Sequence, residues 1–161
     1  MPKNSPLKSR VLDEKDKKIL MLLQEDARMQ LKDISKKVRL NIDSVHKRIK
    51  EMKRKELFSL RAEVNPRKIG FPIVADIKIK LKNVSEVERE KFIKYLQGHK
   101  SVTTLLAVMG DYDFTCVLIA KDGDDLEKTS TQIRQKFKEL ILEWKGLLVL
   151  KTYKFEEYDL L

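Results

Sequence analysis

Two short amphipathic segments follow one another in the N-terminal third of this 161-residue chain. In the first segment Leu31, Ile34 and Val38 recur at helical spacing, which places them on one face of a helix. A break at residues 39–41 ends in Asn41, whose side chain can cap the helix that follows. The second segment repeats the apolar spacing at Ile42, Val45, Ile49 and Met52. A helix, a tight turn and a second helix together predict a helix-turn-helix.

The polar sides of the second segment are strongly basic. A basic helix by itself is more often a solvated surface, but here the turn, the cap and the paired apolar faces occur together. In a helix-turn-helix the second helix lies in the major groove of DNA, with its N-terminal residues near base edges. The pattern therefore favours DNA binding. The polar positions are Asp43, Ser44, His46, Lys47, Arg48, Lys50, Lys53, Arg54 and Lys55.

A helix in front of these segments completes a three-helix unit, and Asp13 is its expected N-cap. Its apolar stripe consists of Ile19, Leu20 and Leu23. After the basic helix, residues 57–64 alternate apolar and polar side chains, which predicts a strand like the wing or tether of a winged helix. Asn65 and Pro66 end it, because the residue before a proline is pushed towards extended or turn conformations. We expect residues 57–71 to form a strand and linker.

From residue 72 onward the pattern changes to alternating strands and helices. Residues 73–81 have one apolar face at a period of two, which predicts a half-buried strand. Ser85 and Glu88 have the spacing of a capping box, so a helix begins there, and Gly98 ends it.

A hairpin and a second helix complete this pattern. Strands over residues 102–109 and 112–120 are joined by a turn. Asp124 opens a helix whose apolar stripe is Leu126, Ile133, Phe137, Leu140 and Ile141. Gly146 is expected to break the chain, and residues 147–158 to form the last strand. The order β-α-β-β-α-β is that of a ferredoxin-like domain, with four antiparallel strands and two helices on one face.

The fold class predicted is therefore α+β, with an N-terminal winged helix-turn-helix domain and a C-terminal ferredoxin-like βαββαβ domain. We expect a flexible tail that contacts phosphates over residues 1–11, the helix-turn-helix domain over residues 12–56 and the ferredoxin-like domain over residues 72–161.

The second face of the predicted sheet is also apolar. Phe114, Cys116 and Leu118 alternate with residues such as Val117 and Ile119, so this strand is apolar on both sides. Two helices can cover only one of these faces. We expect a second copy of the chain to cover the other, which predicts a homodimer. A dimer also presents two basic helices to a pseudo-palindromic DNA site.

Charge separates the two halves of the chain. The net charge is +10; residues 1–65 hold 18 Lys and Arg against 10 Asp and Glu, and the rest hold 17 against 15. A basic module joined to a near-neutral one favours a polyanion-binding protein. A single cysteine, Cys116, excludes an internal disulfide and a multi-cysteine metal site. Without an apolar run of membrane length or a secretory signal, we expect a cytoplasmic protein with no membrane partner.

The sequence resembles the Lrp/AsnC, or feast/famine, family of transcriptional regulators, in its archaeal type. The resemblance covers nearly the whole chain and rests on the order and spacing of several pieces. These pieces are LDEKDKKILMLLQEDAR from Leu12, DISKKVRLN from Asp33, VHKRIKEMKRK from Val45, the Asn65-Pro66 turn, and Gly110-Asp111-Tyr112-Asp113.

Family membership implies a regulator that binds double-stranded promoter DNA as a dimer, often assembled into octamers, with no cofactor and with an amino acid as its usual effector. Base-reading candidates carried over by position are Asn41, Asp43, Ser44, His46 and Lys47, and Arg48 and Lys50 suit phosphates better. The effector candidates are Met109, Gly110, Asp111, Tyr112 and Asp113. Two carboxylates can hold an ammonium group there, and turn N–H groups can hold a carboxylate.

The sequence departs from the family pattern at three positions. Arg39 and Glu56 stand where glycine is common, and Met109 replaces a residue that is often Thr or Ser. The missing hydroxyl keeps open an effector-independent, architectural DNA-binding protein. An enzyme is disfavoured: siroheme decarboxylases share this layout, but residues 107–112 lack the His and Arg of their pattern.

Overall fold

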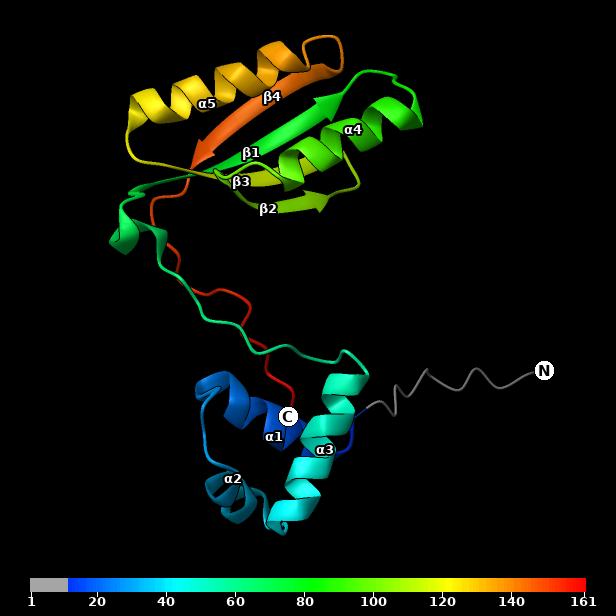
Figure 1. The fold of residues 1–161 in the computed structure, drawn as a ribbon, viewed down its shortest axis with the longest axis vertical. Coiled ribbons are helices and arrows are strands. Elements are labelled where there is room, and N and C mark those ends of the chain that lie inside the picture. Colours follow the sequence, from blue (N-terminus) through cyan, green and yellow to red (C-terminus); the bar gives the residue numbers. More distant parts are fainter. Residues whose placement is uncertain (1–11) are drawn as a thin grey trace, which may run out of the picture. The chain divides into compact units, whose positions relative to one another are not determined.

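The computed structural model describes residues 12–161, and the expected phosphate-binding tail at residues 1–11 lies outside them. The chain forms two compact units (Figure 1). The N-terminal unit extends to Ala62 and also contains Lys154–Leu161, and the second unit is Glu63–Tyr153. The last eight residues, which the predicted boundaries place in the ferredoxin-like domain, therefore group with the helices, because the Tyr158 backbone bonds to Gln24 and Leu160 packs against the helical core.

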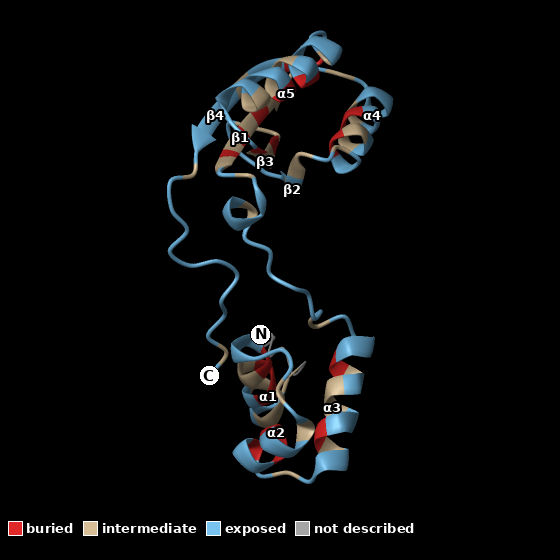
Figure 2. Cartoon of the chain, turned by 60° about the vertical axis from the view of Figure 1, so that its left-hand side comes forward, coloured by how far each residue is buried: buried red, intermediate tan, exposed pale blue. Residues whose placement is uncertain are grey.

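The N-terminal unit contains the three predicted helices, α1 (Glu14–Glu25), α2 (Leu31–Val38) and α3 (Ile42–Arg54). Asp13 and Asp16 form a capping box at the start of α1, and the Asn41 side chain accepts a hydrogen bond from the Ser44 N–H at the start of α3. Figure 2 shows the buried positions of the three helices turned towards one another. This core consists of Ile19, Leu20, Leu23, Ile34, Val38, Val45 and Met52.

Two non-glycine residues that follow helices in this unit adopt left-handed backbone conformations, and Glu156 near the C-terminus also has a positive φ, 44°. Arg39 ends α2 with φ 55°, and Glu56 follows α3 with φ 56°. A side chain with a Cβ is strained there, whereas glycine is not. The family preference for glycine at these positions therefore has a conformational reason in this chain.

Replacing Arg39 or Glu56 by glycine is expected to stabilise the N-terminal unit by about 0.5–1 kcal/mol each, because each removes left-handed strain. Lys18→Gly, at an exposed position inside α1, is the control and should destabilise the unit by about 1 kcal/mol. Denaturant unfolding followed by far-UV circular dichroism measures both effects. Trp144, the only tryptophan, lies in the second unit, so its fluorescence should not change.

The second unit contains a four-stranded antiparallel sheet in the order β2-β3-β1-β4, which confirms the ferredoxin-like prediction. Its elements are β1 (Ile73–Leu81), α4 (Glu86–Gln97), β2 (Val102–Ala107), β3 (Phe114–Ala120), α5 (Gly123–Lys136) and β4 (Ile141–Leu148), preceded by the 3-10 turn Pro66–Ile69. The Ser85–Glu88 capping box opens α4 as predicted. Apolar residues of both helices pack on one sheet face, including Phe92, Leu96 and Ile133 against Ile77 and Leu118.

The predicted last strand is wrong in its position. Strand β4 ends at Leu148, and Gly146 lies inside it, paired with Ile77 of β1. Gly146 therefore continues the strand instead of breaking the chain. The strand predicted over residues 57–64 is also not formed, because this extended segment has no hydrogen-bonded strand partner within the described chain.

Helix α5 begins and ends earlier than predicted. Asp122, not Asp124, is its N-cap, and its side chain accepts a hydrogen bond from the Asp125 N–H. The helix ends at Lys136, but the N–H groups of Leu140 and Ile141 both donate to the Phe137 carbonyl. Because of this turn, the apolar residues after Lys136 keep their helical spacing. The apolar stripe in the sequence therefore predicts a longer helix than the one that forms.

The open face of the sheet carries both apolar and polar side chains. Lys78 Nζ lies 2.8 Å from Asp76 Oδ2 and 3.1 Å from the Thr115 hydroxyl. Leu106 of β2 pairs with Thr115, and Leu147 of β4 pairs with Asp76, so both leucines lie on this face. Leu106 is 54% exposed and Leu147 46%, so the apolar parts of this face have no cover within the described chain.

Candidate nucleic-acid interface and effector loop

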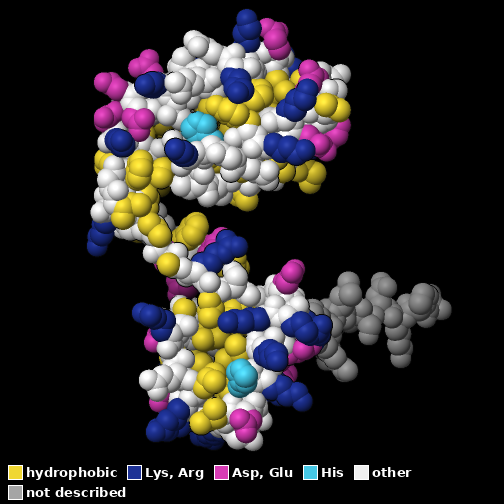
Figure 3. All heavy atoms as spheres, viewed as in Figure 1, with side chains coloured by type: hydrophobic (Ala, Val, Ile, Leu, Met, Phe, Trp, Pro, Cys, Tyr) yellow, Lys and Arg dark blue, Asp and Glu magenta, His cyan; other side chains and the backbone are white. Residues whose placement is uncertain are grey.

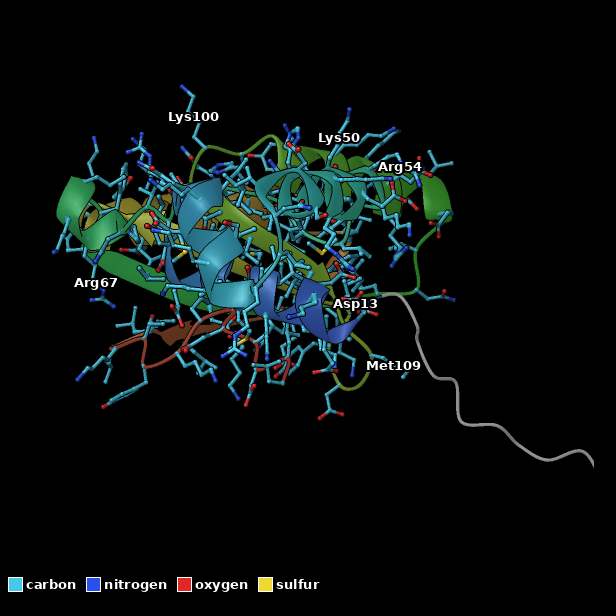
Figure 4. All side chains as sticks on the ribbon, turned by 90° about the horizontal axis from the view of Figure 1, so that it is seen from below. Asp13, Lys50, Arg54, Arg67, Lys100 and Met109 are labelled. Carbon is cyan, nitrogen blue, oxygen red and sulfur yellow. The ribbon has the colours of Figure 1, made fainter. Side chains whose placement is uncertain are left out.

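The exposed side of α3 carries a continuous stripe of charged residues. Asp43, Lys47, Lys50 and Arg54 follow one another at three- or four-residue intervals and are all exposed. Lysine and arginine side chains gather over α3 in Figure 3, and Figure 4 shows Lys50 and Arg54 extending outward from the helix. The opposite side of α3 holds the buried Val45 and Met52. Packing of that side fixes the direction in which the charged stripe points.

The N-terminal end of α3 presents polar groups of several kinds. Asn41 is exposed, and its Oδ1 accepts from the Ser44 N–H at 2.7 Å, so this oxygen is used as the helix cap. Asp43 and His46 are exposed and Ser44 is half-buried. This end of the helix therefore offers donors and acceptors of the types that read base edges.

Arg48 differs from the other basic residues of α3. Its Nη1 lies 2.6 Å from Asp13 Oδ2 and 2.8 Å from Asp16 Oδ1, which ties α3 to the start of α1. Hydrogen bonds to Asp16 and Asp13 raise the pKa of the guanidinium. Burial raises the pKa of Asp13, but hydrogen bonds from the Asp16 N–H and from Arg48 outweigh this and hold it below its usual range. The group that we assign to phosphate binding from the sequence is thus engaged inside the unit.

The remaining ion pairs of α3 gather at its C-terminal end. Arg54 and Lys55 both pair with Glu51, at 2.7 Å and 3.3 Å. The hydrogen bond from Arg54 lowers the pKa of Glu51 to about 2. Among the described residues, no carboxylate lies within ion-pair distance of Lys47 or Lys50. The same holds for Lys53, so these three ammonium groups are the charges of α3 most available to an external polyanion.

The candidate effector residues lie in the loop between β2 and β3. Met109 is fully exposed at the loop, where Figure 4 shows it extending outward. Gly110 has φ 141°, a conformation that favours glycine. The Tyr112 hydroxyl donates to Glu143 at 2.9 Å, and this bond raises the tyrosine pKa.

The two carboxylates of this loop have different surroundings. Asp113 accepts a hydrogen bond from the Leu81 N–H at 2.7 Å, and its own N–H donates to the Ile79 carbonyl. Asp113 therefore holds the loop to the end of β1. Asp111 is exposed, so its carboxylate is the one that can meet a ligand ammonium group without giving up such a bond.

Other chemistry is limited in the part of the chain that the structure describes. No group of three or more His, Cys, Asp or Glu residues within residues 12–161 is placed to hold a metal ion. Burial raises the pKa of the Cys116 thiol to about 12, which keeps it protonated in the core. None of the described helices is long and apolar enough to cross a membrane.

Family models match both units. The AsnC-type helix-turn-helix domain matches residues 12–53, and the Lrp/AsnC ligand binding domain matches residues 74–158. Together they cover most of the chain. It belongs to the Lrp/AsnC family. The resemblance stated from the sequence motifs is thereby confirmed.

Curated relatives of this Lrp/AsnC protein are mostly archaeal HTH-type transcriptional regulators. The chain is 34% identical over 119 residues to the HTH-type transcriptional regulator FL11 of Pyrococcus furiosus, covering 72% of this chain and 76% of the relative. It is 30% identical over 147 residues to the regulator Ptr1 of Methanocaldococcus jannaschii, covering 89% and 95%. The protein is therefore a helix-turn-helix transcriptional regulator with a ligand-binding domain.

Solved structures agree with the fold. A Neisseria meningitidis transcriptional regulator, NMB0573 in complex with L-Met, has a TM-score of 0.81 at 21% identity, covering 89% of this chain and 93% of that one. AsnC of E. coli has a TM-score of 0.78 at 23% identity, covering 89% and 95%. These solved structures thus share the fold of this chain.

Proposed function

We propose that this Lrp/AsnC regulator binds promoter DNA by placing α3 in the major groove. Asn41, Asp43, Ser44, His46 and Lys47 then face base edges, and Lys50 meets a phosphate. The observation that carries the proposal is the exposed stripe along α3, in which Lys47 and Lys50 have no carboxylate partner among the described residues. Phosphate contacts release counterions, so affinity for the protein's own upstream DNA should fall steeply with salt in a fluorescence-anisotropy titration. A flat salt dependence would contradict it.

Arg48 has a positioning role in this proposal. It fixes α3 to the capping box of α1 and so orients the helix that reads DNA. Arg48→Ala is expected to lower the free energy of unfolding of the N-terminal unit by about 1–3 kcal/mol, because two charge-assisted hydrogen bonds are lost. Circular dichroism during urea unfolding measures this, with exposed Lys50→Ala as the control that leaves stability unchanged.

The pH dependence of the loss of stability in Arg48→Ala gives a second test of this role. The folded-state pKa of Asp13 is lowered, so its ion pair stabilises the unit above the unfolded value of 3.8 and is lost as the pH falls below it. The stability difference between wild type and Arg48→Ala should shrink in that acidic range. If the stability difference did not depend on pH, the ion pair with Asp13 would not be the source of the stabilisation by Arg48.

The proposal includes a homodimer formed through the open face of the ferredoxin-like sheet. The exposed Leu106 and Leu147 support it, since both lie on the face opposite the helices. The Asp76–Lys78–Thr115 group adds polar contacts at the centre of the same face. Two copies of α3 could then address half-sites about one helical turn apart.

The proposal further includes an amino-acid effector at the loop that contains Met109–Asp113. Support comes from the ligand-binding domain match and from the exposed Asp111 carboxylate. A free amino acid that binds the folded state should raise the melting temperature of the second unit. A thermal-shift screen of the amino acids, read by Trp144 fluorescence, measures this, and Asp111→Ala should abolish the shift. No shift with any amino acid would favour the effector-independent architectural protein.

A further inference from the structure

The C-terminal tail of the chain lies on the helix-turn-helix unit. An open cavity of about 520 Å³ is lined by Leu20, Leu23 and Gln24 of α1, by the segment after α3, and by Tyr158 and Leu160 of the tail. This cavity lies wholly within the N-terminal unit, which includes Lys154–Leu161. Neither the helix-turn-helix pattern nor the proposed DNA contacts require these last residues.

Two hydrogen bonds hold the tail backbone to α1. Gln24 Nε2 donates to the Tyr158 carbonyl at 3.0 Å, and the Tyr158 N–H donates to Gln24 Oε1 at 3.0 Å. The Gln24 side-chain amide thus bonds to both the N–H and the carbonyl of Tyr158, as a neighbouring strand would. This pairing fixes the position of the tail along the helix. This pairing places the residues that follow Tyr158 next to the helical core.

Apolar packing continues from these bonds. Leu160 is half-buried against the core cluster of the three helices, beside Leu57 and Phe58. Its neighbour Leu161 is 64% exposed. The two adjacent leucines therefore differ in their surroundings, and only the first contributes apolar contacts to the unit.

We propose that residues 154–161 are a fourth structural element of the DNA-binding unit, docked on α1 through Gln24 and Leu160. Docking stabilises the three helices and gives the chain a second crossing between its units, since it leaves the N-terminal unit after Ala62 and re-enters it at Lys154. The partner of the groove on α1 is thus the chain's own C-terminus.

The test compares full-length Leu160→Ala with its matched control Leu161→Ala. Leu160→Ala should lower the melting temperature of the N-terminal unit by about 4–8 °C, and Leu161→Ala should leave it unchanged. In circular dichroism this unit is followed as the transition that Trp144 fluorescence does not report. The transition reported by Trp144 fluorescence should stay the same in both. Equal melting temperatures for the two variants would overturn the proposal.

A second measurement tests the hydrogen bonds by coupling. Gln24→Ala should lower the helical melting temperature in the full chain but have no effect in a chain that ends at Tyr153, because the tail is then already absent. The same Gln24→Ala effect in both chains would also overturn the proposal. Both measurements are made without DNA, so they stand whether or not the proposed DNA contacts of α3 hold.

Discussion

Replacing both Lys47 and Lys50 by alanine is expected to weaken operator binding by about 100-fold near physiological salt. Each ammonium group makes a charge-assisted contact worth roughly 1.5–3 kcal/mol, and about 1.4 kcal/mol is a tenfold change in affinity. Both side chains are exposed on α3, so the fold should not change. The slope of affinity against salt should fall by about one for each lysine that contacts a phosphate.

The control removes the same charge elsewhere. Lys128 and Lys138 are exposed in the second unit, and Lys128→Ala with Lys138→Ala should leave affinity within a few-fold of wild type. Fluorescence anisotropy with one labelled operator fragment measures all three proteins. Wild-type affinity in the Lys47 and Lys50 double variant would mean that DNA binds to another surface.

Placing a charge on the open sheet face is expected to dissociate the proposed dimer. Leu106→Asp puts a carboxylate at a 54% exposed position of β2, where the isolated unit tolerates it but a facing sheet would bury it unpaired. Sedimentation should then find a monomer. Operator affinity should fall by about 100-fold or more, because the second half-site no longer binds as part of one molecule.

Val87→Asp is the matched control for the dimer. Val87 is 62% exposed on α4, whose apolar residues Phe92 and Leu96 pack against the other face of the sheet. This variant should remain a dimer with wild-type affinity. A Leu106→Asp protein that sediments as a dimer would show that the open face is not the interface.

Features set by neighbouring residues could be predicted from the sequence. The Asp13 N-cap and the capping box of Ser85 with Glu88 lie within one helical turn, so the residue types alone predict them. The βαββαβ order also follows from local periodicity. Its boundaries do not, because Gly146 lies inside β4 through its pairing with Ile77, a residue far away in the sequence.

Interactions between residues far apart in the sequence could not be predicted from residue patterns. Arg48 looks like any other basic residue of α3, and its bonds to Asp13 span 35 positions. The bonds between Gln24 and Tyr158 span 134. No periodicity connects such pairs, although an apolar C-terminus after the last strand was a signal that the tail packs against something.

The central claim is that α3 reads DNA sequence, and selection of genomic fragments by the purified protein tests it most directly. The selection is made at about 0.15 M salt, near physiological ionic strength, and includes the protein's own upstream region. Enrichment of a short pseudo-palindrome that the Lys47 and Lys50 double variant fails to enrich is the expected result. Uniform recovery of all fragments would leave an architectural DNA binder, and no recovery of DNA would contradict the assignment of α3.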